Sequence, residues 1–156
     1  MSLRLEDIDL IKRVKYSYVR ALDAGAIDAL AELFTADAEI DYRGGTYRFT
    51  VKGRDEIVAA MCGAFHAGLV GSHTVHMPLI DVHDDDQWTL LDYALNLAED
   101  NKTMIGASHY VDRYVREDGQ WRIARSGNWP GVRAGVFHDP APGLTAHLLG
   151  RTLAPQ

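Results

Sequence analysis

The stretch KTMIGASHYVDRYVREDGQWRIARSGNW, residues 102–129, alternates apolar and polar side chains on both sides of Asp118-Gly119. Alternation with period two is typical of half-buried strands, and a short turn of this type joins antiparallel neighbours. Two similar runs precede it, SHTVHMPLIDV (72–82) and QWTLLDYALNL (87–97), with short acidic segments between them. The second half of the chain is therefore predicted to be a four-stranded antiparallel meander.

The chain begins with a predicted amphipathic helix. Apolar residues recur at steps of three and four between Leu5 and Leu22, which places them on one face of a helix that Gly25 ends. Tyr18 belongs to this face, whereas Tyr16 lies on the other side and should be exposed.

Shorter elements are expected between this helix and the meander. A second helix is predicted over 26–34, followed by a turn at TADA (35–38). Residues 38–53 read as a strand, a turn at Gly44-Gly45 and a second strand, and residues 53–68 as a third helix. This order predicts the α+β class: a cone-shaped α+β barrel in which three helices pack on a strongly curved, mainly antiparallel sheet.

The chain length is that of one domain. All of 1–156 is expected to fold as a single unit. Residues 130–156 hold four of the five prolines and are expected to form a C-terminal wrap. Long curved strands with helices across them leave an apolar cavity, which is a usual place for a small-molecule site.

Composition argues against several partners and compartments. The formal charge is −6 with no block of lysine or arginine, so neither nucleic acid nor an anionic membrane is an expected partner. The one cysteine, Cys62, cannot form an internal disulfide, and the charged N-terminus is unlike a signal peptide. We therefore expect a cytoplasmic protein that binds a small, largely apolar molecule.

Three segments carry a resemblance to a known family: LDAGAIDALAELFTADAEIDY (22–42), SHTVHMP (72–78) and YVDRYVREDGQWRIARSGNW (110–129). Together with the element order, they resemble the SnoaL-like branch of the nuclear transport factor 2-like superfamily over nearly the whole chain. Within that branch the sequence is most similar to cofactor-free lyases: bile-acid 7α-dehydratase, scytalone dehydratase and hexachlorocyclohexane dehydrochlorinase. The superfamily also contains isomerases, cyclases, epoxide hydrolases and non-enzymatic adaptors, so the fold alone does not define the chemistry.

The resemblance implies three catalytic residues. Asp23, at the end of the first helix, would support His73 in the strand after the third helix, and Tyr18 matches a tyrosine five residues before the aspartate. An imidazole oriented by a carboxylate is a usable general base near neutral pH, and the tyrosine would be a general acid or oxyanion donor. Each residue also has a structural interpretation: a core histidine, an aspartate that solvates a turn or caps the next helix, and a core tyrosine.

The walls of the cavity are expected to supply further contacts. Period two predicts that Leu91 and Tyr93 face the pocket while Asp92 does not, unless the strand bulges. The resemblance favours Ser108 and Tyr110 over His109, but a bulge in this strand would make His109 a second pocket histidine. The expected substrate-binding residues are Met61, Phe65, Leu91, Tyr93, Ser108, Tyr110, Ser126 and Asn128.

The direction of two side chains in the last strand has two possible interpretations. Ser126 and Asn128 resemble a pocket-facing Ser-x-Asn pair of scytalone dehydratase. Period two places them opposite Trp121, Ile123 and Trp129, so they could instead form an exposed or interface strand end.

Other chemistries lack their motifs. The spacing His73-x-x-His76 on a strand puts the two rings on opposite faces, and no metal-binding or nucleotide-binding motif occurs, so no metal and no cofactor are expected. Cys62 is expected in the core rather than as a nucleophile.

Two classes of function compete. The first is a cofactor-independent lyase of the dehydratase or dehydrohalogenase type, with an isomerase or polyketide cyclase as its variants. The second is a non-catalytic ligand-binding or dimerisation module. An Asp23–His73 distance within about 3.2 Å would favour the enzyme. Either class permits a homo-oligomer, a dimer or trimer, through an outer sheet face that carries His76 and Trp88.

Overall fold

A computed structural model describes residues 4–43, 48–65, 70–82, 92–97 and 103–129. Within this part, only the backbone is described for residues 70, 92–97, 103–108 and 129. The elements in chain order are α1 (Leu5–Ala24), α2 (Ile27–Ala31), β1 (Phe34–Arg43), β2 (Arg48–Lys52), α3 (Arg54–Ala64), β3 (Val70–Val75), β4 (Asp92–Leu97), β5 (Thr103–Glu117) and β6 (Gln120–Trp129). The predicted order of helices, hairpin and meander is confirmed.

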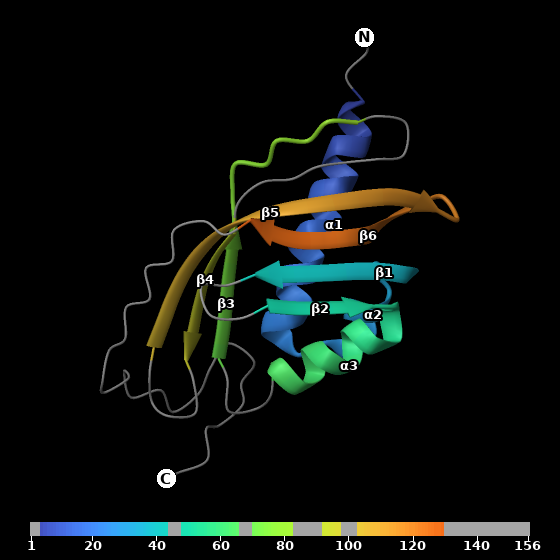
Figure 1. The fold of residues 1–156 in the computed structure, drawn as a ribbon. Helices are drawn as coiled ribbons and strands as arrows, with labels where there is room; N and C mark the ends of the chain where they lie inside the picture. Colours follow the sequence, from blue (N-terminus) through green and yellow to red (C-terminus); the bar gives the residue numbers. More distant parts are fainter. Residues whose placement is uncertain (1–3, 44–47, 66–69, 83–91, 98–102, 130–156) are drawn as a thin grey trace.

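The strands form one curved, open sheet with the order β2-β1-β6-β5-β4-β3. All neighbours are antiparallel except β1 and β6, which are parallel. The long strand β5 begins beside β4 and bends until it runs beside β6, while α1 crosses behind β6 and β1 (Figure 1). The α+β class with three helices on a strongly curved sheet is therefore confirmed. In the described residues the sheet is mixed and does not close into a barrel, because β2 and β3 form its two edges.

Helix α1 ends where the sequence predicts. Gly25 has a φ of 59°, and its N–H donates to the carbonyl of Leu22 at 3.1 Å. The N–H of Ala26 donates to the carbonyl of Ala21 at 2.9 Å, which completes a Schellman motif. A left-handed residue is needed at this position, so glycine ends the helix and holds Asp23 in its last turn.

The inner face of α1 is the core face of the fold. Ile11, Tyr18 and Leu22 are buried against the sheet, while Tyr16 is 43% exposed as predicted. The N-terminal end of the helix is tied to β6 by Asp7, whose Oδ1 accepts a hydrogen bond from the indole N–H of Trp121 at 3.0 Å. No described helix is long and apolar enough to cross a membrane.

The predicted turn at TADA (35–38) is wrong, because these residues belong to β1. The N–H of Ile123 in β6 donates to the carbonyl of Leu33 at 2.7 Å, and the register between β1 and β6 shifts between Phe34 and Glu39. The segment is thus a bulged strand start, held by a distant strand that turn propensity does not report. The second helix is correspondingly shorter than expected.

The register between β5 and β6 shifts at Ala124, which is an extra residue in β6. The bulge resets the alternation of the strand. Trp121 and Ile123 before it and Ser126 after it are therefore all buried. The expectation that Ser126 and Asn128 lie opposite Trp121 and Ile123 is wrong for this reason.

The strand predicted within 72–82 is shorter in the structure, and other predicted features are not among the described residues. Strand β3 ends at Val75, and residues 76–82 are described outside any strand. The predicted C-terminal wrap, Leu91 and Trp88 lie outside the described residues.

Candidate active site

His73 and Asp23 meet at the junction of α1 and β3. The carboxylate of Asp23 accepts two bonds from this one residue: the backbone N–H of His73 donates to Oδ2 at 2.8 Å, and Nδ1 lies 2.5 Å from Oδ1. The side chains are 7% exposed for His73 and 18% for Asp23. The double contact fixes both the position and the ring orientation of the histidine. When Nδ1 carries its proton and donates it in a hydrogen bond to the carboxylate, Nε2 is the nitrogen that can accept a proton.

A carboxylate in the last turn of a helix faces the negative end of the helix dipole. At Asp23 the two donors of His73 offset this unfavourable placement. This accounts for an aspartate at the end of an otherwise apolar helix face better than capping of α2 does, since α2 has no side-chain cap.

Gly71 makes room for this contact. A Cβ on Gly71 would lie 2.9 Å from Oδ1 of Asp23 and 3.6 Å from both Cε1 of His73 and Cε1 of Phe65. Real Cβ atoms do not approach an oxygen so closely, so the carboxylate reaches His73 only over a residue without a side chain. Sequence reasoning assigned Gly71 no role.

Met61 in α3 and Phe65, which directly follows this helix, are both expected at the pocket. The ring of Phe65 is 5.6 Å from the His73 ring between centroids, with the planes at 51°. Met61 is 3% exposed and belongs to the core. Phe65 therefore borders the histidine directly, whereas Met61 is a core residue.

Tyr18 lies fully buried, with an exposed fraction of 1%. Its hydroxyl is 2.7 Å from the hydroxyl of Tyr42, which in turn is 3.0 Å from Oγ of Ser126. Sequence reasoning missed Tyr42. The signal was available, because Tyr42 follows Ala38 and Ile40 at period two on the buried face of β1.

The expected strand residues of β5 and β6 are brought to the same side of the sheet. The ring of Tyr110 stands 6.0 Å from that of Tyr42 in an edge-to-face contact at 76°. Ser126 is buried and donates to Oδ1 of Asp112 at 2.7 Å. Asn128 is used structurally, since its Oδ1 accepts the backbone N–H of Arg43 at 2.5 Å. The alternation of β5 places His109 on the face opposite Tyr110.

The backbone register corrects the expected alternation of β4. Asp92 pairs with Val75 and Ser108, whereas Tyr93 pairs with Thr74 and Ala107. Val75 lies two residues from His73 and therefore on the same face of the sheet. The positions of Asp92 and Ser108 share this face, and the position of Tyr93 lies on the other one. Neighbouring strands decide this register, and the pattern of leucines in β4 pointed the other way.

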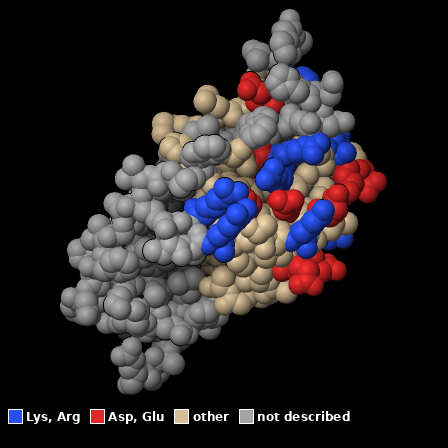
Figure 2. Space-filling model, viewed as in Figure 1, with Lys and Arg blue, Asp and Glu red and all other residues tan. Residues whose placement is uncertain are grey.

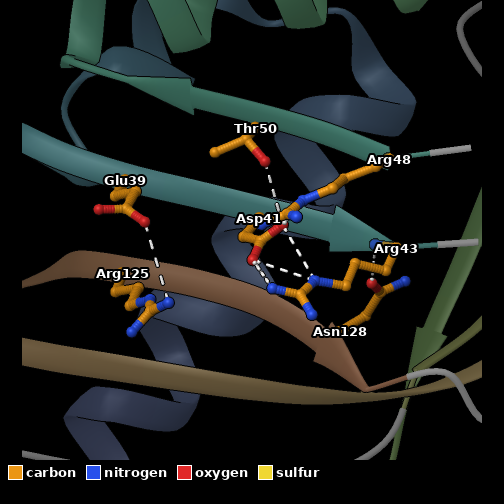
Figure 3. Close-up of polar contacts among 7 residues, drawn as sticks. All are labelled: Glu39, Asp41, Arg43, Arg48, Thr50, Arg125 and Asn128. Atoms are coloured by element: carbon orange, nitrogen blue, oxygen red, sulfur yellow. Dashed lines mark hydrogen bonds and ion pairs between the residues drawn. The ribbon is translucent and has the colours of Figure 1, made fainter.

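The outer face of the sheet carries a separate charged cluster (Figure 2). Asp41, which is 8% exposed, accepts hydrogen bonds from Arg43 at 2.7 Å and from Thr50 at 3.1 Å (Figure 3). The hydrogen bond from Arg43, helped by Thr50 and the charge of Arg48, outweighs burial and lowers the pKa of Asp41 to about 2. In the part of the chain that the structure describes, no three His, Cys, Asp or Glu side chains are arranged to hold a metal ion.

The helices and the open curved sheet define a nuclear transport factor 2-like domain. Its fold is shared by a candidate scytalone dehydratase from Novosphingobium aromaticivorans, at a TM-score of 0.67 and 23% identity, over 96% of this chain and 97% of that one. It is also shared by the hexachlorocyclohexane dehydrochlorinase of Novosphingobium barchaimii, at 0.64 and 19%, over 85% and 92%. An NTF2-like protein with a cystatin-like fold from N. aromaticivorans matches at 0.66 and 24%, over 80% and 81%.

The family follows from the sequence itself. The family model of the SnoaL-like domain matches residues 3–127, which is most of the chain. The protein therefore belongs to the SnoaL-like family of the nuclear transport factor 2-like superfamily.

Proposed function

We propose that the protein is a cofactor-independent lyase of the dehydratase or dehydrohalogenase type that acts on a small, largely apolar ring substrate. The observation that carries the proposal is the double contact between Asp23 and His73, in which one carboxylate holds both the backbone and the ring of the histidine. The shared fold with a dehydrochlorinase and a candidate dehydratase supports this class of reaction.

In the proposed mechanism Nε2 of His73 removes a proton from a carbon next to an electron-withdrawing group. The electron pair of the broken C–H bond forms the new double bond as the leaving group departs from the adjacent carbon. Asp23 stabilises the imidazolium that results, while Tyr18 contacts a hydroxyl leaving group. General-base catalysis of this type contributes on the order of 10²–10⁴ in rate. Return of the proton to another carbon would make the same site an isomerase.

The apolar character of the substrate is inferred from the side chains around the pair. Phe65 packs on His73, and the rings of Tyr110 and Tyr42 lie on the same side of the sheet. Such surfaces favour a ring of a polyketide, terpenoid, steroid or xenobiotic type. Ser108 is retained as a proposed wall residue, because the register puts its position on the sheet face of His73.

We further propose that the enzyme works in the cytoplasm as a homo-oligomer. The presence of a single cysteine supports the compartment. Sedimentation equilibrium of the whole chain tests the assembly, and a monomer at all concentrations would contradict it.

The test incubates the protein with cyclic β-hydroxyketones and cyclic β-chloroketones as substrates for elimination. NMR then measures the loss of the α-proton and the appearance of the alkene. His73→Ala and Asp23→Asn are expected to lower the rate by about 10²–10⁴. The matched controls are His109→Ala, a half-buried histidine on the opposite strand face, and Asp28→Asn, an exposed aspartate. A folded His73→Ala protein with full activity would exclude the mechanism.

A further inference from the structure

A buried ion pair lies beside Tyr18 and has no part in the mechanism above. Nζ of Lys15 in α1 is 2.8 Å from Oδ2 of Asp112 in β5, and the two side chains are 6% and 0% exposed. Lys15 also stands 3.0 Å above the ring centroid of Tyr110. A buried ion pair is weak evidence for stability, because desolvation of the charges offsets their attraction. The pair is hydrogen-bonded to the linked hydroxyls of Tyr18, Tyr42 and Ser126, and this position indicates another role.

Asp112 accepts every hydrogen bond that links it to this network. Its Oδ2 accepts from Nζ of Lys15 at 2.8 Å and from the hydroxyl of Tyr114 at 2.9 Å, and its Oδ1 accepts from Ser126 at 2.7 Å. A carboxylate beside an ammonium group has no proton to give. The single hydroxyl proton of Ser126 is therefore committed to Asp112.

This commitment determines the direction of the next two bonds. Ser126 has no second proton, so in its 3.0 Å contact with Tyr42 it must accept, and Tyr42 must donate. Tyr42 then has no proton left for its 2.7 Å contact with Tyr18, so Tyr18 donates there. All three hydroxyl protons point toward Asp112.

We propose that Lys15 and Asp112 are positioning residues that fix the proton direction of the Tyr18–Tyr42–Ser126 chain, so that Tyr18 meets any further group as a hydrogen-bond acceptor. Whatever reaches the oxygen of Tyr18 must then bring a proton, as a hydroxyl does and a halide or carbonyl does not. The placement of Tyr18 at the ligand rests on the proposed function, whereas the direction of the chain does not. This changes the role first expected of Tyr18, which was that of a donor.

Asp112→Asn tests the direction while keeping the shape of the side chain. The amide oxygen would face the ammonium of Lys15, so the amide nitrogen would donate to Ser126 and reverse the chain. Tyr42 and Ser126 both donate and accept in either direction. Tyr18 changes from a donor to Tyr42 into an acceptor from it.

Raman spectroscopy of the whole chain without substrate measures this change. The intensity ratio of the tyrosine Fermi doublet is low for a phenol that donates a strong hydrogen bond and high for one that accepts. The contribution of Tyr18 is isolated by subtracting the spectrum of a matching Tyr18→Phe protein. We expect a low ratio in the wild type, a high ratio in Asp112→Asn, and a smaller rise in Ser126→Ala, which breaks the chain but keeps both charged groups of the ion pair. Asp41→Asn is the control, because it alters a carboxylate with similar donors on the outer face of the sheet.

The outcomes of this experiment distinguish failure of the proton-direction proposal from failure of the proposed lyase mechanism. A Tyr18 ratio that is high in the wild type, or that stays unchanged in both variants, would overturn it. If Asp112→Asn does not fold, Ser126→Ala decides alone. His73→Ala leaves the spectrum unchanged whether or not it retains activity, so the chain can stand when the lyase mechanism fails.

Discussion

Asp41 on the outer face of the sheet and Asp23 on the inner face are both held by donors, but those donors lie at different distances along the chain. Arg43 and Thr50 reach Asp41 from two and nine residues away, and the side chain of Arg43 is 50% exposed. His73 reaches Asp23 from 50 residues away, and Lys15 reaches Asp112 from 97. The outer cluster is thus a local surface feature, whereas the inner contacts exist only when α1, β3, β5 and β6 have assembled.

The comparison implies that loss of a contact lowers the free energy of unfolding by different amounts on the two faces. Exposed ion pairs contribute about 0–1 kcal/mol, while removal of one partner from a buried pair leaves an uncompensated charge. The inner face should therefore dominate stability as well as activity.

The largest effect is expected for Lys15→Met. It leaves Asp112, which is fully buried, without its counter-charge and should lower the free energy of unfolding by about 3–5 kcal/mol. Urea denaturation measures the loss. Lys52→Met, at an exposed position of β2, is the control and should change little. The double variant Lys15→Met/Asp112→Asn should lose less than the single one; an equal or larger loss would show that charge is not the cause.

Gly71→Ala should have a smaller effect on stability and a specific effect on the site. The added Cβ would meet Oδ1 of Asp23 at 2.9 Å, so the carboxylate must move away from His73. We expect a loss of about 1–3 kcal/mol in unfolding free energy, as for overpacked sites. The imidazole ¹⁵N resonances of His73 should shift as its Nδ1 bond lengthens.

Gly63→Ala is the matched control for this substitution. A Cβ on Gly63 meets nothing within 4 Å, and its place inside α3 favours alanine by about 0.5–1 kcal/mol. Unchanged His73 resonances in Gly71→Ala would contradict the assigned role of Gly71.

The smallest effect is expected at Asp41, and it should depend on pH. The pKa of this carboxyl is lowered from 3.8 to about 2 in the folded protein, chiefly by the hydrogen bond from Arg43. A lowered folded pKa stabilises the protein above the unfolded pKa, and that contribution fades as the pH falls. The stability difference between wild type and Asp41→Asn should be constant from neutral pH down to about 4 and shrink between about 4 and 2.

Denaturation at a series of pH values measures this profile. Glu39→Gln is the control, since Glu39 has only a partly exposed contact with Arg125 at 3.8 Å. If the stability difference between wild type and Asp41→Asn grows as the pH falls, the prediction is contradicted.

The site was predictable to the extent that it follows helix ends and strand starts. Gly25 marks the end of α1 and so places Asp23, and the alternating run at 72–82 places His73 in a strand. Their contact could be expected only through the family resemblance, because a helix end and a strand 50 residues apart have no local signal for one another.

The buried network was not predictable in this way. Lys15 lies on the buried side of α1 at a position where a lysine normally indicates exposure, and Asp112 lies in a strand where its register with Ser126 depends on the bulge at Ala124. Its members come from four separate elements, and each bond requires the others to be in place.

By itself the sequence determined the order of the elements, the end of α1 at Gly25 and the bounds of β6, because period, glycine and turn residues act over a few neighbouring positions. The tertiary structure alone decided that TADA (35–38) is part of a strand and that β1 and β6 run parallel. It also decided that the position of Asp92, and not that of Tyr93, is on the sheet face of His73. The inward direction of Lys15 toward Asp112 was likewise decided only there. These features depend on pairing between distant strands and on the desolvation of charges in the assembled core, neither of which leaves a local pattern in the chain.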